Sequence, residues 1–126
     1  ANLDRIQVVK GWLDASGESE EKVYDVAWSD DRVIGEDGTL PAVGNTVDVA
    51  TGRYTNEIGD AQLSTVWRDP DFDPGQRAFY YVRVLQIPTP RHTLYDAIAL
   101  GMDPKDTKHP ATIQERAYSS PIWYTP

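Results

Sequence analysis

Apolar and polar residues alternate along several segments of the chain, which is the pattern of half-buried β-strands. The clearest segment runs from Ala78 to Gln86 and consists almost wholly of aromatic and β-branched residues, the types that suit a pleated surface. Read with period two, one of its faces is apolar, and the other carries Arg83 between apolar neighbours. We therefore expect residues 78–86 to form the central strand of the fold.

Five other segments share this strand character, and they cover residues 3–14, 22–29, 45–56, 61–67 and 112–124. The first two are expected to form a hairpin, because strands that follow one another usually pair. A second hairpin is expected to close through residues 57–60, whereas the polar, Gly-rich residues 29–44 indicate a long surface loop. Pro121 interrupts the last segment, and because proline has no N–H to donate, it predicts an edge or a bulge there.

One short helix is expected between the last two strands, with Thr93 as its N-cap and Gly101 as its stop. It lies in a connection of residues 87–111, and connections of that length are usually functional or disordered. Flanking prolines and the capped helix argue for order. We expect a surface on this connection to face a partner, with the residues Arg91, His92, Leu94, Tyr95 and Ile98. The alternative is a lid over the end of the chain's own domain.

These elements predict an all-β fold in one domain, residues 1–126. The number of strands and the spacing of the turns favour an immunoglobulin/fibronectin-like β-sandwich with one short helix in a long insertion between the last two strands.

The composition argues against some classes of function but does not identify the function. The chain of 126 residues has a net charge of −8, which argues against nucleic-acid binding, because that requires a basic face to neutralise phosphates. No apolar run approaches the length of about 20 residues that a membrane helix needs. Cysteine is absent, which excludes disulfides and thiolate metal sites. The chain begins with Ala1 rather than Met, and we therefore expect it to be cut from a longer protein.

Asp69, Asp71 and Asp73 have the one-three-five spacing of a calcium-binding loop. That loop would also need glycine at position six and a bidentate carboxylate at position twelve, where the chain has Pro74 and Tyr80. The three aspartates are therefore weak metal candidates. A rigid turn is favoured, in which the carboxylates accept hydrogen bonds from nearby backbone N–H groups.

Histidines and tryptophans are the remaining candidates for site residues. His92 and His109 have no third ligand or orienting carboxylate at a suitable spacing, so loop histidines are favoured over catalytic ones. Four tryptophans lie on predicted strands, and exposed together they could form a sugar-binding platform: Trp12, Trp28, Trp67 and Trp123. Such residues more often fill a core, and the core interpretation is favoured.

Five motifs in order carry a family resemblance: LDRIQVVKGW from Leu3, VDVA from Val47, DPDFDP from Asp69, AFYYVRV from Ala78 and ERAYSSPIWY from Glu115. They closely resemble the C-terminal part of bacterial proteins in the domain of unknown function 3604 family. That family looks related to the polymerase and histidinol phosphatase superfamily, in which a metal-dependent phosphoesterase barrel precedes a small β-domain.

The resemblance implies hydrolase chemistry for the longer protein, not for this chain. Such barrels hold a metal cluster with many His and carboxylate ligands that begin with a His-x-His segment, and the chain has no such segment. We expect a non-catalytic C-terminal β-domain without a cofactor of its own, which packs on or completes the catalytic barrel. Its partner would be the missing N-terminal catalytic domain, where a divalent metal would bind. The alternative is a carbohydrate- or protein-binding module.

Overall fold

The computed structural model describes all 126 residues, with 34% of them in strands. In chain order the elements are β1 (Leu3–Leu13), β2 (Ser19–Trp28), β3 (Ala78–Gln86), β4 (Thr89–Pro90), α1 (His92–Leu100), the 3-10 helix η1 (Pro104–Thr107), β5 (Thr112–Ile113), β6 (Arg116–Tyr118) and β7 (Ile122–Tyr124). Every strand pair is antiparallel. The mostly β character with one short α-helix is confirmed.

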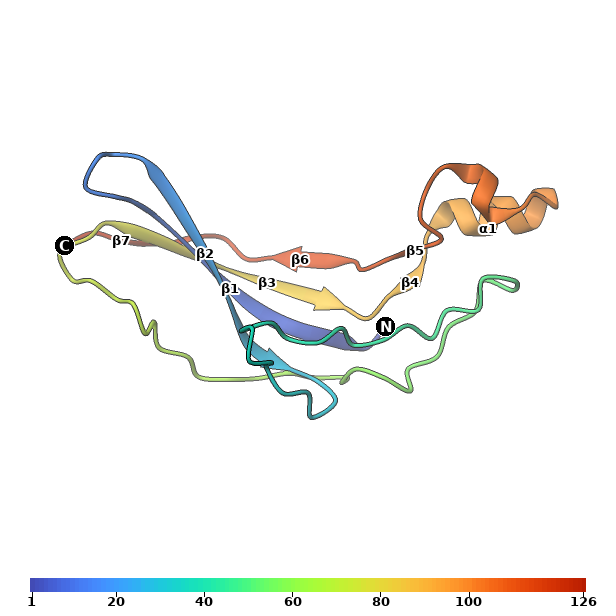
Figure 1. Cartoon of the computed structure of the whole chain (residues 1–126), viewed down its shortest axis with the longest axis horizontal. Coiled ribbons are helices and arrows are strands. Elements are labelled where there is room, and N and C mark those ends of the chain that lie inside the picture. Colours follow the sequence, from blue (N-terminus) through green and yellow to red (C-terminus); the bar gives the residue numbers. More distant parts are fainter.

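Most of the strands form one five-stranded sheet in the order β2-β1-β3-β6, with β7 also paired to β3 (Figure 1). The apolar strand β3 is central, as predicted. The predicted hairpin of β1 and β2 is present, and Asp14 holds its turn by accepting hydrogen bonds from the backbone N–H groups of Ser16 at 2.8 Å and Glu18 at 2.9 Å. The pairing of β1 with β2 is therefore as predicted, whereas the pairing of β1 with β3 joins segments that lie far apart in the sequence.

The last predicted strand is present in two pieces along the outer edge of β3. β6 pairs with residues 83–85 and β7 with residues 78–80. The break between them contains Pro121, which cannot donate to a ladder. Between the pieces, the Ser119 hydroxyl accepts the hydrogen bond of Val82 N–H at 2.9 Å.

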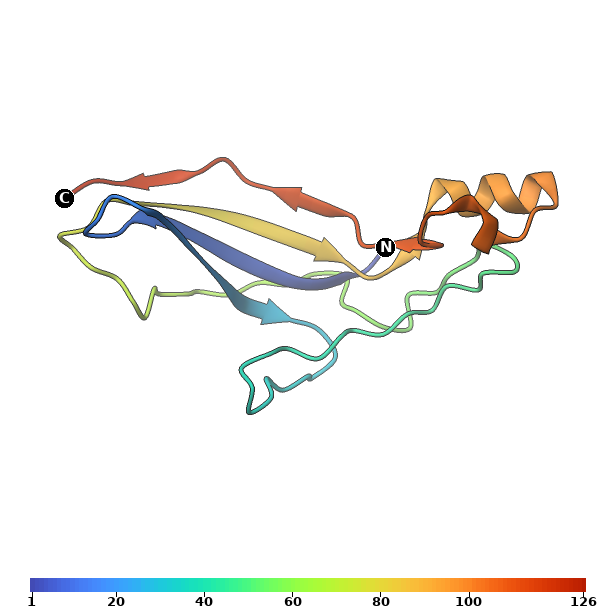
Figure 2. The same ribbon diagram turned by 45° about the horizontal axis from the view of Figure 1, so that its top comes forward.

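Residues 45–56 and 61–67 do not form the two predicted strands. Apart from isolated bridges between Asp48 and Arg53 and between Leu3 and Asp60, the segment from residue 30 to residue 77 is irregular. It runs along the sheet to the end that carries α1 and then back (Figures 1 and 2). An alternating segment forms a strand only where a neighbouring strand is available for backbone hydrogen bonding. Here local side chains bind the backbone instead, and the Thr46 hydroxyl donates to the carbonyl oxygen of Thr55 at 2.7 Å. The immunoglobulin-like sandwich is not confirmed.

The connection after β3 is ordered around its helix. β4 and β5 pair at its base, and Gly101, with φ 65°, ends α1 as predicted. The N-cap is Arg91 and not the predicted Thr93. The chain leaves β4 after Pro90, Arg91 is extended with φ −72° and ψ 150°, and the first helical residue is His92, so Thr93 already lies inside the first turn.

The apolar core is small for a chain of this length. Only 15 of the 126 residues are buried, and the accessible surface is 8415 Å². A folded monomer of 14.1 kDa is expected to expose about 6,700 Å². The fully buried apolar side chains lie in two places, Val9 within the sheet and Ile87 with Leu94 where the sheet meets the helical connection. The chain thus leaves about 1,700 Å² more surface exposed than a compact protein of its mass.

Candidate functional site

The first face of the sheet is crossed by the turn that contains the predicted aspartates. On this face Tyr80, Lys10 and Lys22 are directly opposite one another on β3, β1 and β2. The turn after Arg68 crosses over these residues, and there Asp69 forms an ion pair with Lys10 and Asp71 forms one with Lys22. We call these residues the aspartate clip, and it also includes Tyr24 on β2.

The inner half of the aspartate clip consists of Lys10, Asp69 and Tyr80, and hydrogen bonds join the three side chains. Lys10 Nζ lies 2.6 Å from Asp69 Oδ2 and donates to the carbonyl oxygen of Asp71 at 2.7 Å. The Tyr80 hydroxyl donates to the same carboxylate oxygen of Asp69 at 2.8 Å. Lys10 is 2% exposed, so its charge is acceptable only because these partners replace water. The pair is therefore held in place and has no free nucleophile or base to offer.

The outer half of the clip is exposed. Lys22 Nζ lies 2.6 Å from Asp71 Oδ2, and the Tyr24 hydroxyl donates to that oxygen at 2.8 Å. Both charged side chains are about half exposed, and an ion pair in that setting adds little to stability. The contacts of Lys22 and Tyr24 with Asp71 therefore orient the turn but contribute little to the free energy of folding.

These contacts shift the pKa values of the clip residues. Burial acts to raise the pKa of Asp69, but the hydrogen bonds from Lys10 and Tyr80 outweigh it and hold that pKa below 3.8. The hydrogen bond from Lys22 lowers the pKa of Asp71. Burial, together with the bond to Asp69, raises the pKa of the Tyr80 hydroxyl to about 12. The aspartates are therefore ionised and the tyrosine protonated throughout the neutral range.

An apolar groove of about 530 Å³ lies between the turn and the sheet. Its lining includes Val8, Trp67, Phe72, Tyr80, Val82 and Ile122. Trp67 is fixed against Tyr24, with ring centroids 5.0 Å apart, and Phe72 packs edge-on against Tyr124 at 4.9 Å. The clip therefore holds one wall of this groove at a set distance from the sheet.

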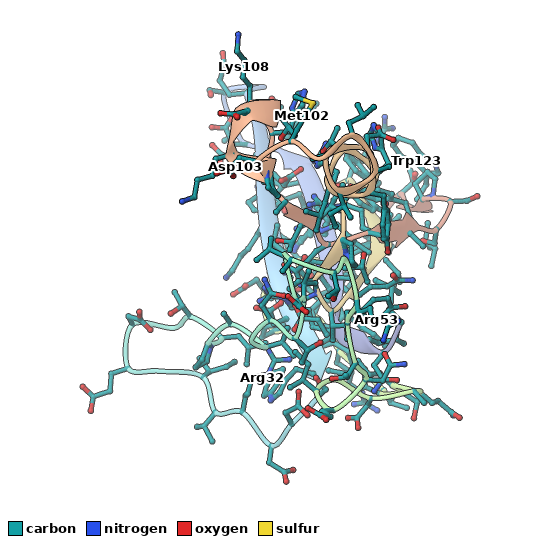
Figure 3. The ribbon with its side chains drawn as sticks, turned by 90° about the vertical axis from the view of Figure 1, so that its right-hand side faces the viewer. Arg32, Arg53, Met102, Asp103, Lys108 and Trp123 are labelled. Atoms are coloured by element: carbon teal, nitrogen blue, oxygen red, sulfur yellow. The ribbon has the colours of Figure 1, made fainter.

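The second face of the sheet carries an aromatic row. Its four members are Phe79 and Tyr81 on β3, Tyr118 on β6 and Trp123 on β7, and we call them the aromatic face. Phe79 and Tyr81 are parallel within 9°, whereas Trp123 is tilted 47° against Phe79 and Tyr118 is tilted 45° against Tyr81. Trp123 is 72% and Tyr118 57% exposed. Figure 3 shows Trp123 on the side of the ribbon away from the loop that carries Arg32.

A glycine lets the aromatic face lie close to the sheet. Gly11 is directly opposite Phe79, and a Cβ atom at Gly11 would fall 2.3 Å from Cζ of the Phe79 ring. The ring therefore covers the backbone of β1, in a place that any larger residue would occupy.

Arg83 lies beside this row and is held by a line of polar residues. Asp25, Gln7 and Arg83 are directly opposite one another on β2, β1 and β3. Gln7 donates to Asp25 Oδ1 at 2.7 Å, and its own Oε1 accepts from Arg83 Nε at 2.8 Å. This leaves the two terminal nitrogens of the guanidinium free for the paired contacts that arginine makes with a carboxylate.

The five residues expected to face a partner are split by the structure. Leu94 is buried at 1% exposure, whereas Tyr95 and Ile98 are 48% and 36% exposed. His92 is exposed and Arg91 half-buried. Leu94 is therefore part of the chain's own interior, and the surface that remains consists of the other four residues.

The other candidates are separated. Asp73 accepts a hydrogen bond from Gly75 N–H at 2.8 Å, as expected of a rigid turn, and lies outside the clip. The structure contains no group of three or more His, Asp or Glu side chains that could hold a metal ion. Trp12, Trp28 and Trp67 are half-buried, so Trp123 is the one exposed indole.

Sequence reasoning missed Lys10, Lys22, Tyr24 and Tyr80 as partners of the aspartates. A signal was present, because Lys10 lies in an apolar strand, and a lysine in such a place needs a carboxylate partner. The identity of that partner depends on a contact across 59 positions, which periodicity does not encode. Gln7 and Asp25 were missed for the same reason.

Residues 1–126 match a family described as "Protein of unknown function (DUF3604)". The chain belongs to this family. No curated protein and no solved structure matches it. The structure also has no helix with the length and apolar character that crossing a membrane requires.

Proposed function

We propose that this DUF3604 chain is a non-catalytic C-terminal β-domain of a bacterial, metal-dependent phosphoesterase or related hydrolase, and that it packs on the catalytic barrel. The observation that carries the proposal is the openness of the fold. The surface that exceeds the expectation for a compact monomer, about 1,700 Å², is twice the roughly 800 Å² that one partner buries in a standard interface. A chain that exposes this much surface is best explained as part of a larger folded unit.

The exposed large apolar side chains support the same proposal. They include Val66 at 95%, Val33 at 76% and Leu100 at 72% exposure. They lie at separate positions in the irregular segment and in α1, so apolar surface is uncovered along much of the chain, as expected of a fold that lacks a covering layer. In the intact protein, the rest of the polypeptide would provide the second layer of the sandwich that the sequence favours.

The helical connection is the part proposed to lie near the rim of the catalytic site. It stands at one end of the elongated chain, away from the C-terminus (Figure 1). The residues that would face the barrel are Arg91, His92, Tyr95 and Ile98, with Leu94 behind them as support. A divalent metal would be held by the catalytic domain, since the turn with Asp69 and Asp71 is already bonded to lysine and tyrosine.

The alternative, a carbohydrate- or protein-binding module, needs a platform of exposed indoles for its carbohydrate form. Trp123 alone is exposed, and it is tilted against its neighbour Phe79. We therefore favour the hydrolase domain.

The test compares three preparations: the intact protein that contains this chain, the same protein without residues 1–126, and the chain alone. We expect metal-dependent turnover of an aryl phosphate with added Mn²⁺ by the intact protein and none by the chain. We also expect the truncated protein to unfold at a lower temperature, because its barrel would lose a packed neighbour. Turnover by the chain alone, or an unchanged melting temperature after truncation, would refute the proposal.

A further inference from the structure

We infer that the aromatic face, with Arg83 beside it, is the surface through which the chain docks on the catalytic domain of its own polypeptide. This inference rests on the proposed function and adds to it a second docking surface, remote from the helical connection. The occupant has a stated chemistry: an apolar protein surface that carries one carboxylate opposite Arg83.

The arrangement of the rings favours a protein as the occupant. A sugar chain stacks best on flat, coplanar rings, but the two exposed rings, Trp123 and Tyr118, are tilted by 47° and 45° against the inner pair. The surface is therefore corrugated, with an exposed aromatic ring at each end and half-buried rings between. Such a surface suits side chains that interdigitate, and exposed Trp, Tyr and Arg are the residues that dominate protein–protein interfaces.

The charges favour a carboxylate on the occupant. Arg83 is held by the Asp25–Gln7 line at Nε, so its orientation is fixed before binding. Asp25 already accepts from Gln7 and lies 3.4 Å from Arg5 Nη1, so the acid in line with Arg83 is already paired, and the unpaired Glu21 lies opposite Gly11, four residues along β1 from Gln7. A prealigned guanidinium loses little side-chain entropy when a carboxylate binds it.

The same point argues against a second copy of the chain as the occupant. Two copies that pack by a two-fold axis present the same patch to each other. The acid in line with Arg83 on each copy, Asp25, is already paired. The net charge of −8 on each copy adds repulsion over the whole molecule.

Hydroxyl-radical footprinting with mass spectrometry tests the inference on the intact protein and on the chain alone. We expect the oxidation rates of Trp123 and Tyr118 to fall at least fivefold in the intact protein. Phe72, 48% exposed on the opposite face, is the matched control and is expected to change less than twofold. Protection of Tyr95 in the intact protein would show that the helical connection is covered, which is what the proposed function expects.

The variant Arg83→Gln, made in the intact protein, separates docking from folding. It is expected to return the oxidation rate of Tyr118 severalfold toward that of the chain alone, while Arg53→Gln, in the loop near α1, leaves it unchanged. Circular dichroism of each variant checks that the chain is folded, and Arg83→Lys serves as a second variant with an intermediate effect.

The outcomes distinguish the two proposals. Protection of Tyr95 without protection of Trp123 and Tyr118 overturns this inference and leaves the proposed function standing. Protection at neither place overturns both. Protection of Trp123 in the chain alone that rises with protein concentration, or on addition of an oligosaccharide, shows a second copy or a sugar as the occupant and also overturns it.

Discussion

At the scale of single residues, the buried pair of Lys10 and Asp69 decides where the irregular segment meets the sheet. An ion pair that is 3% and 6% exposed adds little when compared with apolar side chains of the same size, but removal of one partner leaves an unpaired buried charge. The pair therefore acts as a constraint on register. Only a turn that carries its acid at position 69 can lie over Lys10.

Asp69→Asn is expected to lower the free energy of unfolding by about 3 kcal/mol or more, because the ammonium of Lys10 would lose its counter-charge. Urea titration followed by tryptophan fluorescence measures the change. Asp73→Asn is the matched control in the same turn and should stay within about 0.5 kcal/mol of the wild type. The double variant Lys10→Met, Asp69→Leu should recover most of the loss, and equal losses in the single and double variants would contradict this account.

The clip also predicts an acid-sensitive part of the stability. The folded pKa values of Asp69 and Asp71 lie below the ordinary value of 3.8, so the folded state binds fewer protons than the unfolded state just below that pH. The contribution is fully present above about pH 4 and is lost as the pH falls through the folded pKa values. Urea midpoints from pH 7 down to pH 2.5 should fall more steeply for the wild type than for Asp69→Asn. Parallel curves would show that the clip is not the source.

At the scale of elements, Gly52 determines how α1 meets the long irregular segment. Its φ of 67° is unfavourable for other residues, and a Cβ atom there would lie 2.9 Å from Cε1 of Tyr95 and 3.2 Å from Cδ1 of Ile98. The side chains of Tyr95 and Ile98 on α1 thus pack directly against the backbone at Gly52. The close approach explains how a helix of nine residues is held without a side-chain cap at its start.

Gly52→Ala should destabilise the chain by about 1 kcal/mol more than Gly38→Ala, because the added methyl group overpacks the helix contact. Gly38 is the matched control, since its φ of 76° carries a similar backbone cost while a Cβ atom added there would have no other atom within 4 Å. Urea denaturation gives the free energies, and hydrogen exchange of the α1 amides shows where the change acts. Equal costs at the two glycines would mean that the helix contact is not tight.

The sequence predicts a strand correctly only where the alternating segment has another strand beside it to pair with. The strand from Ala78 to Gln86 and the hairpin before it were predictable, because their alternating residues lie beside partners of the same kind. The helix end at Gly101 was predictable from local chemistry. Residues 45–56 and 61–67 alternate as well, but no free ladder lies beside them. The clip and the Gln7 line join distant segments, so neither could be found by spacing.

At the scale of the whole molecule, the open sheet predicts a weak response to denaturant. The slope of unfolding free energy against urea concentration follows the surface that unfolding exposes. This chain buries less than a compact protein of its mass, so we expect its slope to lie near the lower end of the usual range, at about 1 kcal/mol per molar urea. Within the intact protein, the same residues should unfold with a steeper slope. A slope of about 2 kcal/mol per molar or more for the chain alone would show a larger folded core than the structure has.

The pairing of β1 with β3 also affects how the chain is made. Leu3 pairs with Gln86 and Trp12 with Ala78, and the polypeptide between β2 and β3 must be synthesised before that ladder can form. At translation rates of about 5–20 residues per second, roughly 50 intervening residues take about 3 to 10 seconds. During that interval the β1–β2 hairpin has left the ribosome with the inner edge of β1 unpaired and the apolar side chain of Val9 uncovered. A nascent hairpin in that state is a natural substrate for a chaperone, and slower translation of residues 29–77 would lengthen the time for which it needs one.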